Sequence, residues 1–304
     1  MNLVVGATGL VGGHVCLELA KTGKSVRALV RPTGDRGRIE VLKSQKVDLV
    51  QGDLKEPATL EAACAGVATV ISTASSTLSR QAGDSIETVD RQGQLNLFEA
   101  ARAGGVRHFI FVSFPPMGLD FPLDRAKREV EERLRGSSLA YTILWPTFFN
   151  EVWLSATLGF DAANAKVRIY GSGQNKIRWI SYLDVAAFAA ACVENTTVRN
   201  KVIQLGGPEA LSPLEVVRIF EKIARRPFTV DHVPEEALRA QKAAATDSLS
   251  ESFAAIMLGA AQGDTIDMTE ARSVFPAIVG RLSSVREYAS RSLNVSSGAG
   301  ATSA

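Results

Sequence analysis

Short apolar segments alternate with longer amphipathic segments along the chain up to Pro146. The hydrophobic period changes between that of a strand and that of a helix at each step. The expected strands cover residues 2–5, 25–30, 47–51, 67–72, 108–113 and 139–144, and the expected helices cover residues 10–22, 35–45, 57–64, 84–103 and 123–135. Several of these strands are apolar throughout, as in a parallel sheet covered on both faces. The pattern therefore predicts an α/β fold with a doubly wound parallel sheet and helices on both faces.

The pattern changes after Pro146. Residues 201–207 look like one more strand of the sheet, whereas residues 234–290 are mostly helical in pattern. Ser212 and Glu215 form a predicted capping box at the start of a helix. We expect a smaller, helix-rich C-terminal lobe with one return of the chain to the sheet. The expected division is a sheet domain of residues 1–150 and 179–205, a variable lobe of residues 151–178 and 206–294, and a disordered tail of residues 295–304.

The stretch GATGLVG places Gly6, Gly9 and Gly12 three residues apart, after the first expected strand and at the start of the first expected helix. In the first βα turn of a doubly wound sheet, such glycines permit a tight turn and bring a pyrophosphate close to the helix N-terminus. The alternative is a tight turn without a ligand. The pattern favours a dinucleotide site. The same turn contributes three further expected cofactor contacts: Thr8, Leu10 and Val11.

The end of the second strand carries Arg31, with Arg38 a few residues further on, where an NAD site usually has an acidic residue. A guanidinium there can bind a 2′-phosphate, so NADP(H) is favoured over NAD(H). NAD(H) stays open because Asp35 lies in the same loop, and a solvated basic loop is the alternative to a phosphate site. After the third strand, Asp53 is expected to accept a hydrogen bond from the adenine amino group and Leu54 to lie against the ring. Asp53 could equally cap a helix.

The chain has 304 residues and a net charge of +2, from 34 basic and 32 acidic side chains. This balance gives no reason to expect nucleic acid or a membrane as a partner. The cysteines Cys16, Cys64 and Cys192 and the histidines are scattered, so no metal site is expected and the thiols are expected to be reduced. No apolar run approaches a membrane span and no signal peptide is recognisable, so we expect a cytoplasmic location.

Several segments share the pattern of one family between residue 1 and about residue 224. They are GATGLVG, VRALVR, QGDL, VDRQGQLNLFEAARAGGVRHFIFVS, RAKREVEERLRGSSLAYTILWPTFFNE, WISYLDVAAFAAA and KVIQLGGPEALSPLEV. With them the chain resembles the NmrA-like atypical short-chain dehydrogenase/reductases. The resemblance implies an NAD(P)-binding Rossmann domain and a small, variable substrate lobe. Some members look like NADPH-dependent reductases of quinones, dyes or phenolic compounds, and others are dinucleotide sensors.

Ordinary short-chain reductases protonate a carbonyl with the tyrosine of a Tyr-x-x-x-Lys motif. None of the four tyrosines of this chain has a lysine four residues later. The helix expected over residues 123–135 carries Lys127, but Leu123 stands where the tyrosine would be. The resemblance places Lys127 over the nicotinamide ribose, where it could also bind a substrate oxygen; an exposed lysine beside Glu131 is the alternative. Ser113, at the carboxyl end of the fifth strand, is the second candidate for contact with substrate or nicotinamide.

Residues after two further strands complete the expected site. Those after the fourth strand are expected to let the cofactor ribose pass: Thr73, Ala74 and Ser75. After the sixth strand, Pro146 and Phe148 are expected to border the nicotinamide. The family often has Arg before this proline, whereas this chain has Trp145. Three residues leading into the variable lobe suit a flat apolar substrate, although aromatic residues near such a junction are more often core: Phe149, Asn150 and Trp153.

The expected function is an NADPH-dependent reductase that transfers a hydride to an apolar, quinone-like or conjugated small molecule. The alternative is a non-catalytic redox sensor that acts through a protein partner, which the missing tyrosine and the sensor members of the family favour. A purely structural interaction module would bind no dinucleotide.

Overall fold

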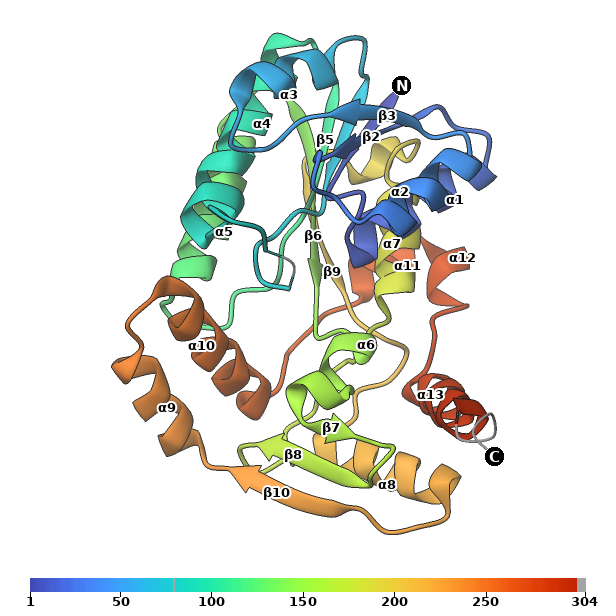
Figure 1. The fold of residues 1–304 in the computed structure, drawn as a ribbon, viewed down its shortest axis with the longest axis vertical. Coiled ribbons are helices and arrows are strands. Elements are labelled where there is room, and N and C mark those ends of the chain that lie inside the picture. The colour runs from blue at the N-terminus through green and yellow to red at the C-terminus, as the bar shows by residue number, and fades with distance from the viewer. Residues whose placement is uncertain (79, 300–304) are drawn as a thin grey trace.

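A seven-stranded sheet forms the centre of the molecule (Figure 1). The computed structural model describes residues 1–78 and 80–299. The strands follow the order β3-β2-β1-β4-β5-β6-β9, and every neighbouring pair is parallel. Their bounds are β1 Asn2–Val5, β2 Val26–Val30, β3 Asp48–Gln51, β4 Thr69–Ser72, β5 His108–Val112, β6 Ala140–Pro146 and β9 Lys201–Leu205. Each overlaps an expected strand, so the prediction of a doubly wound parallel sheet is confirmed.

Helices cover both faces of this sheet. Successive side chains of β1 point to opposite faces, so Leu3 and Val5 enter one core and Val4 enters the other. The helices on the Leu3 face are α3 Pro57–Cys64, α4 Gln92–Ala103 and α5 Pro122–Arg135, and those on the Val4 face are α1 Leu10–Lys21, α2 Arg36–Ser44 and α7 Tyr182–Ala191. Figure 1 shows these layers on opposite sides of the strands. Burial on both faces explains why the strands are apolar throughout.

The segment expected as a single helix over residues 84–103 consists of two elements. A π-helical turn, η1 Ile86–Arg91, precedes α4. The Ser85 hydroxyl accepts a hydrogen bond from the Thr88 N–H, and the Ser85 N–H donates to the Thr88 hydroxyl, which fixes the start of the turn. Hydrogen bonds in a π turn span five residues instead of four. Asp90 lies in this turn and is fully buried.

The second half of the chain adds a lobe with its own core, below the main sheet in Figure 1. Its small sheet has the order β10-β8-β7, and its core includes the rings of Phe160, Phe220 and Phe228, which lie tilted against one another. The elements are α6 Asn150–Trp153, η2 Ala156–Leu158, β7 Phe160–Asp161, β8 Lys166–Tyr170, α8 Pro213–Ala224, β10 Thr229–Val233, α9 Glu235–Ala244, α10 Ser248–Gln262 and α13 Val285–Ala299. The capping box of Ser212 and Glu215 is confirmed. The small sheet was not expected, because β7 is very short and β10 is largely exposed.

Part of the expected variable lobe lies on the main sheet instead. The short helices α11 Thr269–Val274 and α12 Pro276–Val279 follow α10. A further short helix, η3 Thr196–Val198, precedes β9. Phe275 belongs to the core on the Val4 face, and its ring lies 5.4 Å from that of Phe188 in α7. The apolar side chains of this segment therefore join the sheet domain. The backbone of residues 295–299, expected as tail, continues α13, and residues 300–304 lie outside the described residues.

Candidate cofactor groove and apolar cavity

The glycine turn joins β1 to α1 at the carboxyl edge of the sheet. Gly6 has a φ of +83°, which favours glycine, and a Cβ there would lie 2.7 Å from Thr73 Oγ1. Gly9 donates a hydrogen bond from its N–H to the Gly6 carbonyl at 2.8 Å. A Cβ on Gly12 would lie 2.3 Å from the same carbonyl oxygen. The three glycines thus allow the turn, the loop after β4 and the first turn of α1 to lie against one another.

The N-terminus of α1 lacks a capping side chain. Gly9 is its N-cap residue, and no side chain in residues 1–78 or 80–299 accepts a hydrogen bond there. The first amides of a helix have no partner within the helix and carry the positive end of its dipole. The turn therefore offers backbone donors to an anionic group, which is the arrangement of a pyrophosphate site.

A groove of about 430 Å³ runs from this turn across the ends of β1, β2, β3 and β4. Most residues expected to hold the cofactor line it: Gly6, Thr8, Gly9, Leu10, Val11, Arg31, Asp53, Leu54, Thr73, Ala74 and Ser75. Gly12 lies buried behind the turn. The sequence patterns do not single out four other lining residues: Thr77, Leu78, Asp84 and Val89. Phe149, expected at the substrate, lines the groove as well. The groove lies beside β1, which has β2 on one side and β4 on the other. The strand order reverses there, and this is the usual ligand position in such sheets.

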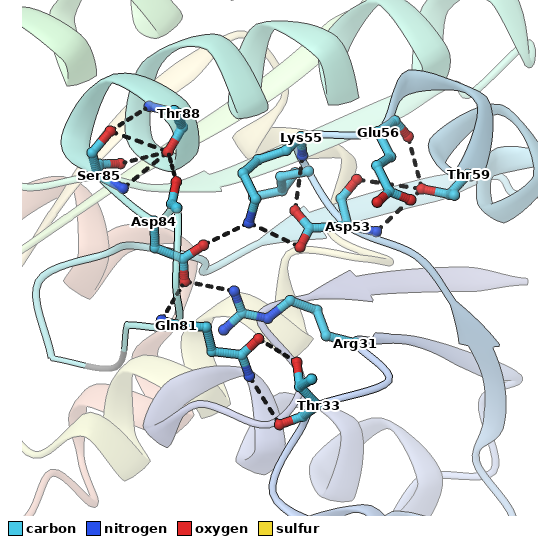
Figure 2. A network of polar contacts seen from close by, with 12 residues as sticks. Arg31, Thr33, Asp53, Lys55, Glu56, Thr59, Gln81, Asp84, Ser85 and Thr88 are labelled. Atoms are coloured by element: carbon cyan, nitrogen blue, oxygen red, sulfur yellow. Dashed lines mark hydrogen bonds and ion pairs between the residues drawn. The ribbon is translucent and has the colours of Figure 1, made fainter.

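Arg31 is paired with a carboxylate from a distant part of the chain (Figure 2). Its Nη1 lies 2.6 Å from Asp84 Oδ2. Lys55 Nζ lies 2.6 Å from the other Asp84 oxygen and 2.9 Å from Asp53 Oδ2. The side chain of Asp84 is only 2% exposed. Arg31 thus reaches the groove with its charge partly balanced.

The two cations dominate the titration of Asp84. Burial alone would raise the pKa of this carboxyl, but the hydrogen bonds from Arg31 and Lys55 outweigh burial and lower the pKa to about 2. Asp53 accepts hydrogen bonds from both the N–H and the Nζ of Lys55, and it does not cap α3, whose N-cap residue is Glu56. The four side chains form a neutral cluster at the adenosine end of the groove.

Arg38 is the second guanidinium on the groove. Its Nη1 donates to the Thr8 carbonyl at 2.5 Å, and no carboxylate within the described residues forms an ion pair with it. Asp35, the residue that could have favoured NAD(H), caps α2 by accepting from the Arg38 N–H at 2.9 Å. The carboxylate of Asp35 does not line the groove. The loop after β2 therefore presents cations to the groove.

A second, apolar space of about 230 Å³ adjoins the groove. Aromatic, methionine and isoleucine side chains from both halves of the chain line it: Phe114, Met117, Phe148, Phe149, Trp153, Phe253, Ile256 and Met257. Phe253, Ile256 and Met257 come from α10, which the sequence patterns do not connect with the site. The Ser252 hydroxyl accepts a hydrogen bond from the Leu123 N–H at 3.2 Å and joins α10 to the start of α5. A flat apolar molecule fits such walls.

Lys127 and Ser113 bring polar atoms to this apolar cavity. Lys127 is 4% exposed, so it is not the solvated helix lysine of the alternative interpretation. Its Nζ lies 3.3 Å from Asp90 Oδ1 and 5.0 Å from the centre of the Phe111 ring. Ser113 Oγ lies 3.4 Å from Arg128, which donates a shorter hydrogen bond of 2.6 Å to the Phe114 carbonyl. Among the described residues, Lys127 is the cation that lines the cavity.

Some residues from the end of β6 onward line the cavity, and others are buried in the core. Pro146 and Phe148, expected beside the cofactor, line the apolar cavity together with Trp153, and Phe149 lines both spaces. The rings of Phe148 and Trp153 meet edge to face at 4.8 Å. Asn150 lines neither space: it is fully buried, and its side-chain amide has no hydrogen-bond partner in the described part of the chain.

Trp145 faces away from both spaces. Its Nε1 donates to Glu131 Oε1 at 2.8 Å, and the Arg128 guanidinium lies 5.3 Å from its ring. Trp145 lines neither the groove nor the cavity. The departure from the family pattern at this position therefore affects contacts with Glu131 and Arg128 of α5. It does not change the residues that line the groove or the cavity.

Within residues 1–78 and 80–299, no group of three or more His, Cys, Asp or Glu side chains is arranged to hold a metal ion. The same residues contain no helix with the length and apolar character needed to cross a bilayer. Burial raises the pKa of Cys16 to about 12 and that of Cys64 to about 11, and Cys192 is buried as well. The thiols serve as small core residues.

The fold and the glycine turn are those of the doubly wound dinucleotide-binding proteins. The chain belongs to the NmrA-like family, whose model matches residues 2–289, so the expected membership is confirmed.

Two relatives illustrate the range of the family. The chain is 31% identical over 230 residues to an NAD(P)H azoreductase from Xenophilus azovorans, with 75% of each chain covered. It is 28% identical over 237 residues to the photosystem II assembly factor Ycf39 from Trieres chinensis, with 76% of this chain and 72% of the relative covered. Among solved structures, an NADPH-dependent quinone oxidoreductase from Escherichia coli complexed with NADPH matches with a TM-score of 0.78 at 24% identity, over 97% of this chain and 100% of the other.

Proposed function

We propose that the protein is an NADPH-dependent reductase that transfers a hydride to an apolar, quinone-like or conjugated acceptor. One observation carries the proposal: the groove and the apolar cavity adjoin and share part of their walls. The shared residues are Val11, Thr73, Ser75, Thr77, Leu78 and Phe149. A dinucleotide lying in the groove would end where the cavity begins, which is the arrangement that hydride transfer requires.

The groove suits a dinucleotide on its own features. The glycine turn is filled so closely that Cβ atoms at Gly6 and Gly12 would clash, and the uncapped α1 offers amide donors to a diphosphate. Arg31 and Arg38 line the adenosine end and favour the 2′-phosphate of NADP(H). The names of the azoreductase and of the quinone oxidoreductase bound to NADPH support the same cofactor and the same reaction class. When bound, the nicotinamide supplies the hydride.

Lys127 is the proposed catalytic residue. Reduction of a quinone consumes one hydride and one proton, and negative charge develops on the acceptor oxygen before the proton arrives. The Lys127 ammonium, on the wall of the cavity, can stabilise that charge, and the apolar walls strengthen the interaction by excluding water. Ser113, at the end of β5, can donate a second hydrogen bond to the acceptor. No tyrosine in the described residues lines the cavity, so the proton would reach the acceptor from the Lys127 ammonium, which solvent then reprotonates, or from solvent directly.

The acceptor class follows from the side chains of the cavity. No carboxylate in the part of the chain that the structure describes lines it, and its aromatic and methionine side chains offer flat apolar contacts. A neutral planar molecule with one polar oxygen near Lys127 meets these conditions. We therefore place quinones and conjugated ketones ahead of sugars or charged metabolites.

Absorbance at the NADPH band tests the proposal, with purified protein and a panel of one benzoquinone, one naphthoquinone, one conjugated ketone and one azo dye. We expect turnover with a quinone and a loss of at least about tenfold in kcat/KM for Lys127→Met. Lys222→Met, at an exposed position of α8, is the matched control and should retain the wild-type rate. Tight NADPH binding without turnover of any acceptor would overturn the reductase proposal.

The redox-sensor alternative is kept because a named relative is an assembly factor. A sensor must bind NADP+ and NADPH with different affinities, since a ligand shifts a conformational balance only through differential binding. Calorimetric titration with both forms decides the point: equal affinities remove the physical basis of sensing. Absence of binding by either dinucleotide would favour a purely structural module instead.

A further inference from the structure

A fully buried carboxylate lies behind the lysine of the cavity. Asp90 in η1 is 0% exposed. Its Oδ2 accepts hydrogen bonds from the N–H and the Oγ of Ser76, at 2.9 and 2.7 Å. Its Oδ1 accepts no hydrogen bond and lies 3.3 Å from Lys127 Nζ. One oxygen of Asp90 is thus satisfied by the loop after β4, and the other faces the ammonium group.

The surroundings of this ion pair are apolar. Lys127 Nζ lies over the Phe111 ring, and within residues 1–78 and 80–299 Asp90 is the carboxylate that pairs with it. An ammonium group buried without a partner is strongly unfavourable, and so is a carboxylate. Each of the two charges therefore requires the other in order to stay buried at this position.

The loop that Asp90 holds belongs to both spaces of the site. Ser76 lies between Ser75 and Thr77, which line the groove and the cavity alike. Gln94 fixes the preceding part of the loop by accepting from the Ser72 hydroxyl at 2.7 Å and donating to the Ala74 carbonyl at 3.2 Å. Asp90 of η1 and Gln94 of α4 thus both bind the loop after β4. Of these two residues, Asp90 also contacts Lys127.

We propose that Asp90 is a positioning residue that holds the Lys127 ammonium at the wall of the apolar cavity and, through Ser76, fixes it relative to the loop shared by groove and cavity. The proposal rests on the function proposed above for Lys127. Asp90 does not touch the acceptor, since it does not line the cavity. It acts on the acceptor through Lys127, so its removal should cost far more catalysis while Lys127 is present than when Lys127 is absent.

A double-mutant cycle tests this dependence. The full-length wild type, Asp90→Asn, Lys127→Met and the double variant are compared with NADPH and a naphthoquinone. We expect Asp90→Asn to lower kcat at least about tenfold and to cause a much smaller loss, or none, in the Lys127→Met background. Asp90→Glu, which keeps the charge, should recover part of the rate. Equal losses in both backgrounds, or no loss in the single variant, would overturn the proposal.

A second variant covers the case in which Asp90→Asn does not fold. Ser76→Ala keeps the carboxylate and removes one of its hydrogen bonds. The proposal expects a smaller loss in kcat that is again much reduced or absent in the Lys127→Met background. A loss of the same size in both backgrounds would show that Ser76 acts independently of Lys127, against the proposal.

A measurement without turnover separates this inference from the reductase function. In protein carrying ¹³C-labelled lysine, the Lys127 Cε resonance is assigned by its absence in Lys127→Met. We expect this resonance to shift in Asp90→Asn and to stay in place in Asp53→Asn, which removes a carboxylate that pairs with Lys55. An unchanged Lys127 signal in Asp90→Asn contradicts the proposed contact. Inactivity of the wild type with every acceptor overturns the reductase proposal alone.

Discussion

A Cβ atom on Gly12 would lie 2.3 Å from the carbonyl oxygen of Gly6, a distance that real Cβ atoms do not adopt. The oxygen belongs to the backbone and the backbone also fixes where the Cβ lies, so relief requires the turn or α1 to move. We expect Gly12→Ala to raise the dissociation constant of NADPH at least about tenfold, measured by calorimetry. Gly13→Ala is the control in the same helix, where the added Cβ would lie 3.2 Å from the Ala7 carbonyl and needs only a small adjustment. Wild-type affinity in Gly12→Ala would contradict the role of the turn.

Replacing either of the two groove arginines should weaken NADPH binding, but only the loss of Arg31 should also lower the thermal stability. Arg38 forms no ion pair in the described residues, so Arg38→Ala should weaken NADPH about tenfold and leave NADH and thermal stability nearly unchanged. Arg31→Ala should weaken NADPH and also lower the melting temperature, because the buried Asp84 loses one of its two cations. Titration with both dinucleotides and a melting curve separate the two effects. A loss of NADH affinity equal to that of NADPH would exclude a 2′-phosphate contact.

His108 should make the protein sensitive to mild acid. Burial lowers its pKa from 6.5 to about 4, and its Nε2 lies 2.8 Å from Thr142 Oγ1. The folded state therefore keeps the imidazole neutral while the unfolded state takes up a proton, so stability is full above pH 6.5 and falls as the pH drops towards 4. This group alone should cost about 2 kcal/mol at pH 5.

Urea unfolding at pH 7.5 and pH 5 measures the contribution of His108. His108→Gln can still bond to Thr142 and takes up no proton. The difference in unfolding free energy between the variant and the wild type should move by about 2 kcal/mol in favour of the variant at pH 5. Identical pH profiles would show that another group controls acid sensitivity.

Filling the apolar cavity should affect the acceptor and spare the cofactor. Met257 lines the cavity from α10 and does not line the groove. Met257→Trp adds volume there, so the KM for a quinone should rise several-fold while NADPH affinity stays constant. Gln262→Trp, at an exposed position of the same helix, is the control. A parallel loss of NADPH binding in Met257→Trp would mean that α10 shapes the groove as well.

The sequence predicts the sheet and the glycine turn because both depend on local patterns. Strands such as β1, buried on both faces, leave an apolar run, and Gly6, Gly9 and Gly12 stand at a spacing set by the turn itself. The residues after β4, such as Thr73, can be placed from topology alone, since the carboxyl ends of parallel strands share one edge.

Other parts of the site depend on contacts between distant segments. Asp84 meets Arg31 from 53 residues away, and Met257 arrives only because α10 lies against α5. Asp90 stands in a stretch that is expected to be one regular helix, where an aspartate is usually exposed. Asp90 is buried because it lies in the π turn and accepts hydrogen bonds from Ser76, and neither feature has a recognisable pattern in the sequence.

The wall that the groove and the cavity have in common has a kinetic consequence. If the nicotinamide end of a dinucleotide lies beside Thr73, Ser75 and Phe149, it becomes one side of the space in which the acceptor is held. An acceptor that arrives first would meet an unfinished enclosure and leave again quickly. Addition would then be ordered, with the dinucleotide entering first and departing last, and excess acceptor would slow the cycle by delaying the exchange of spent dinucleotide.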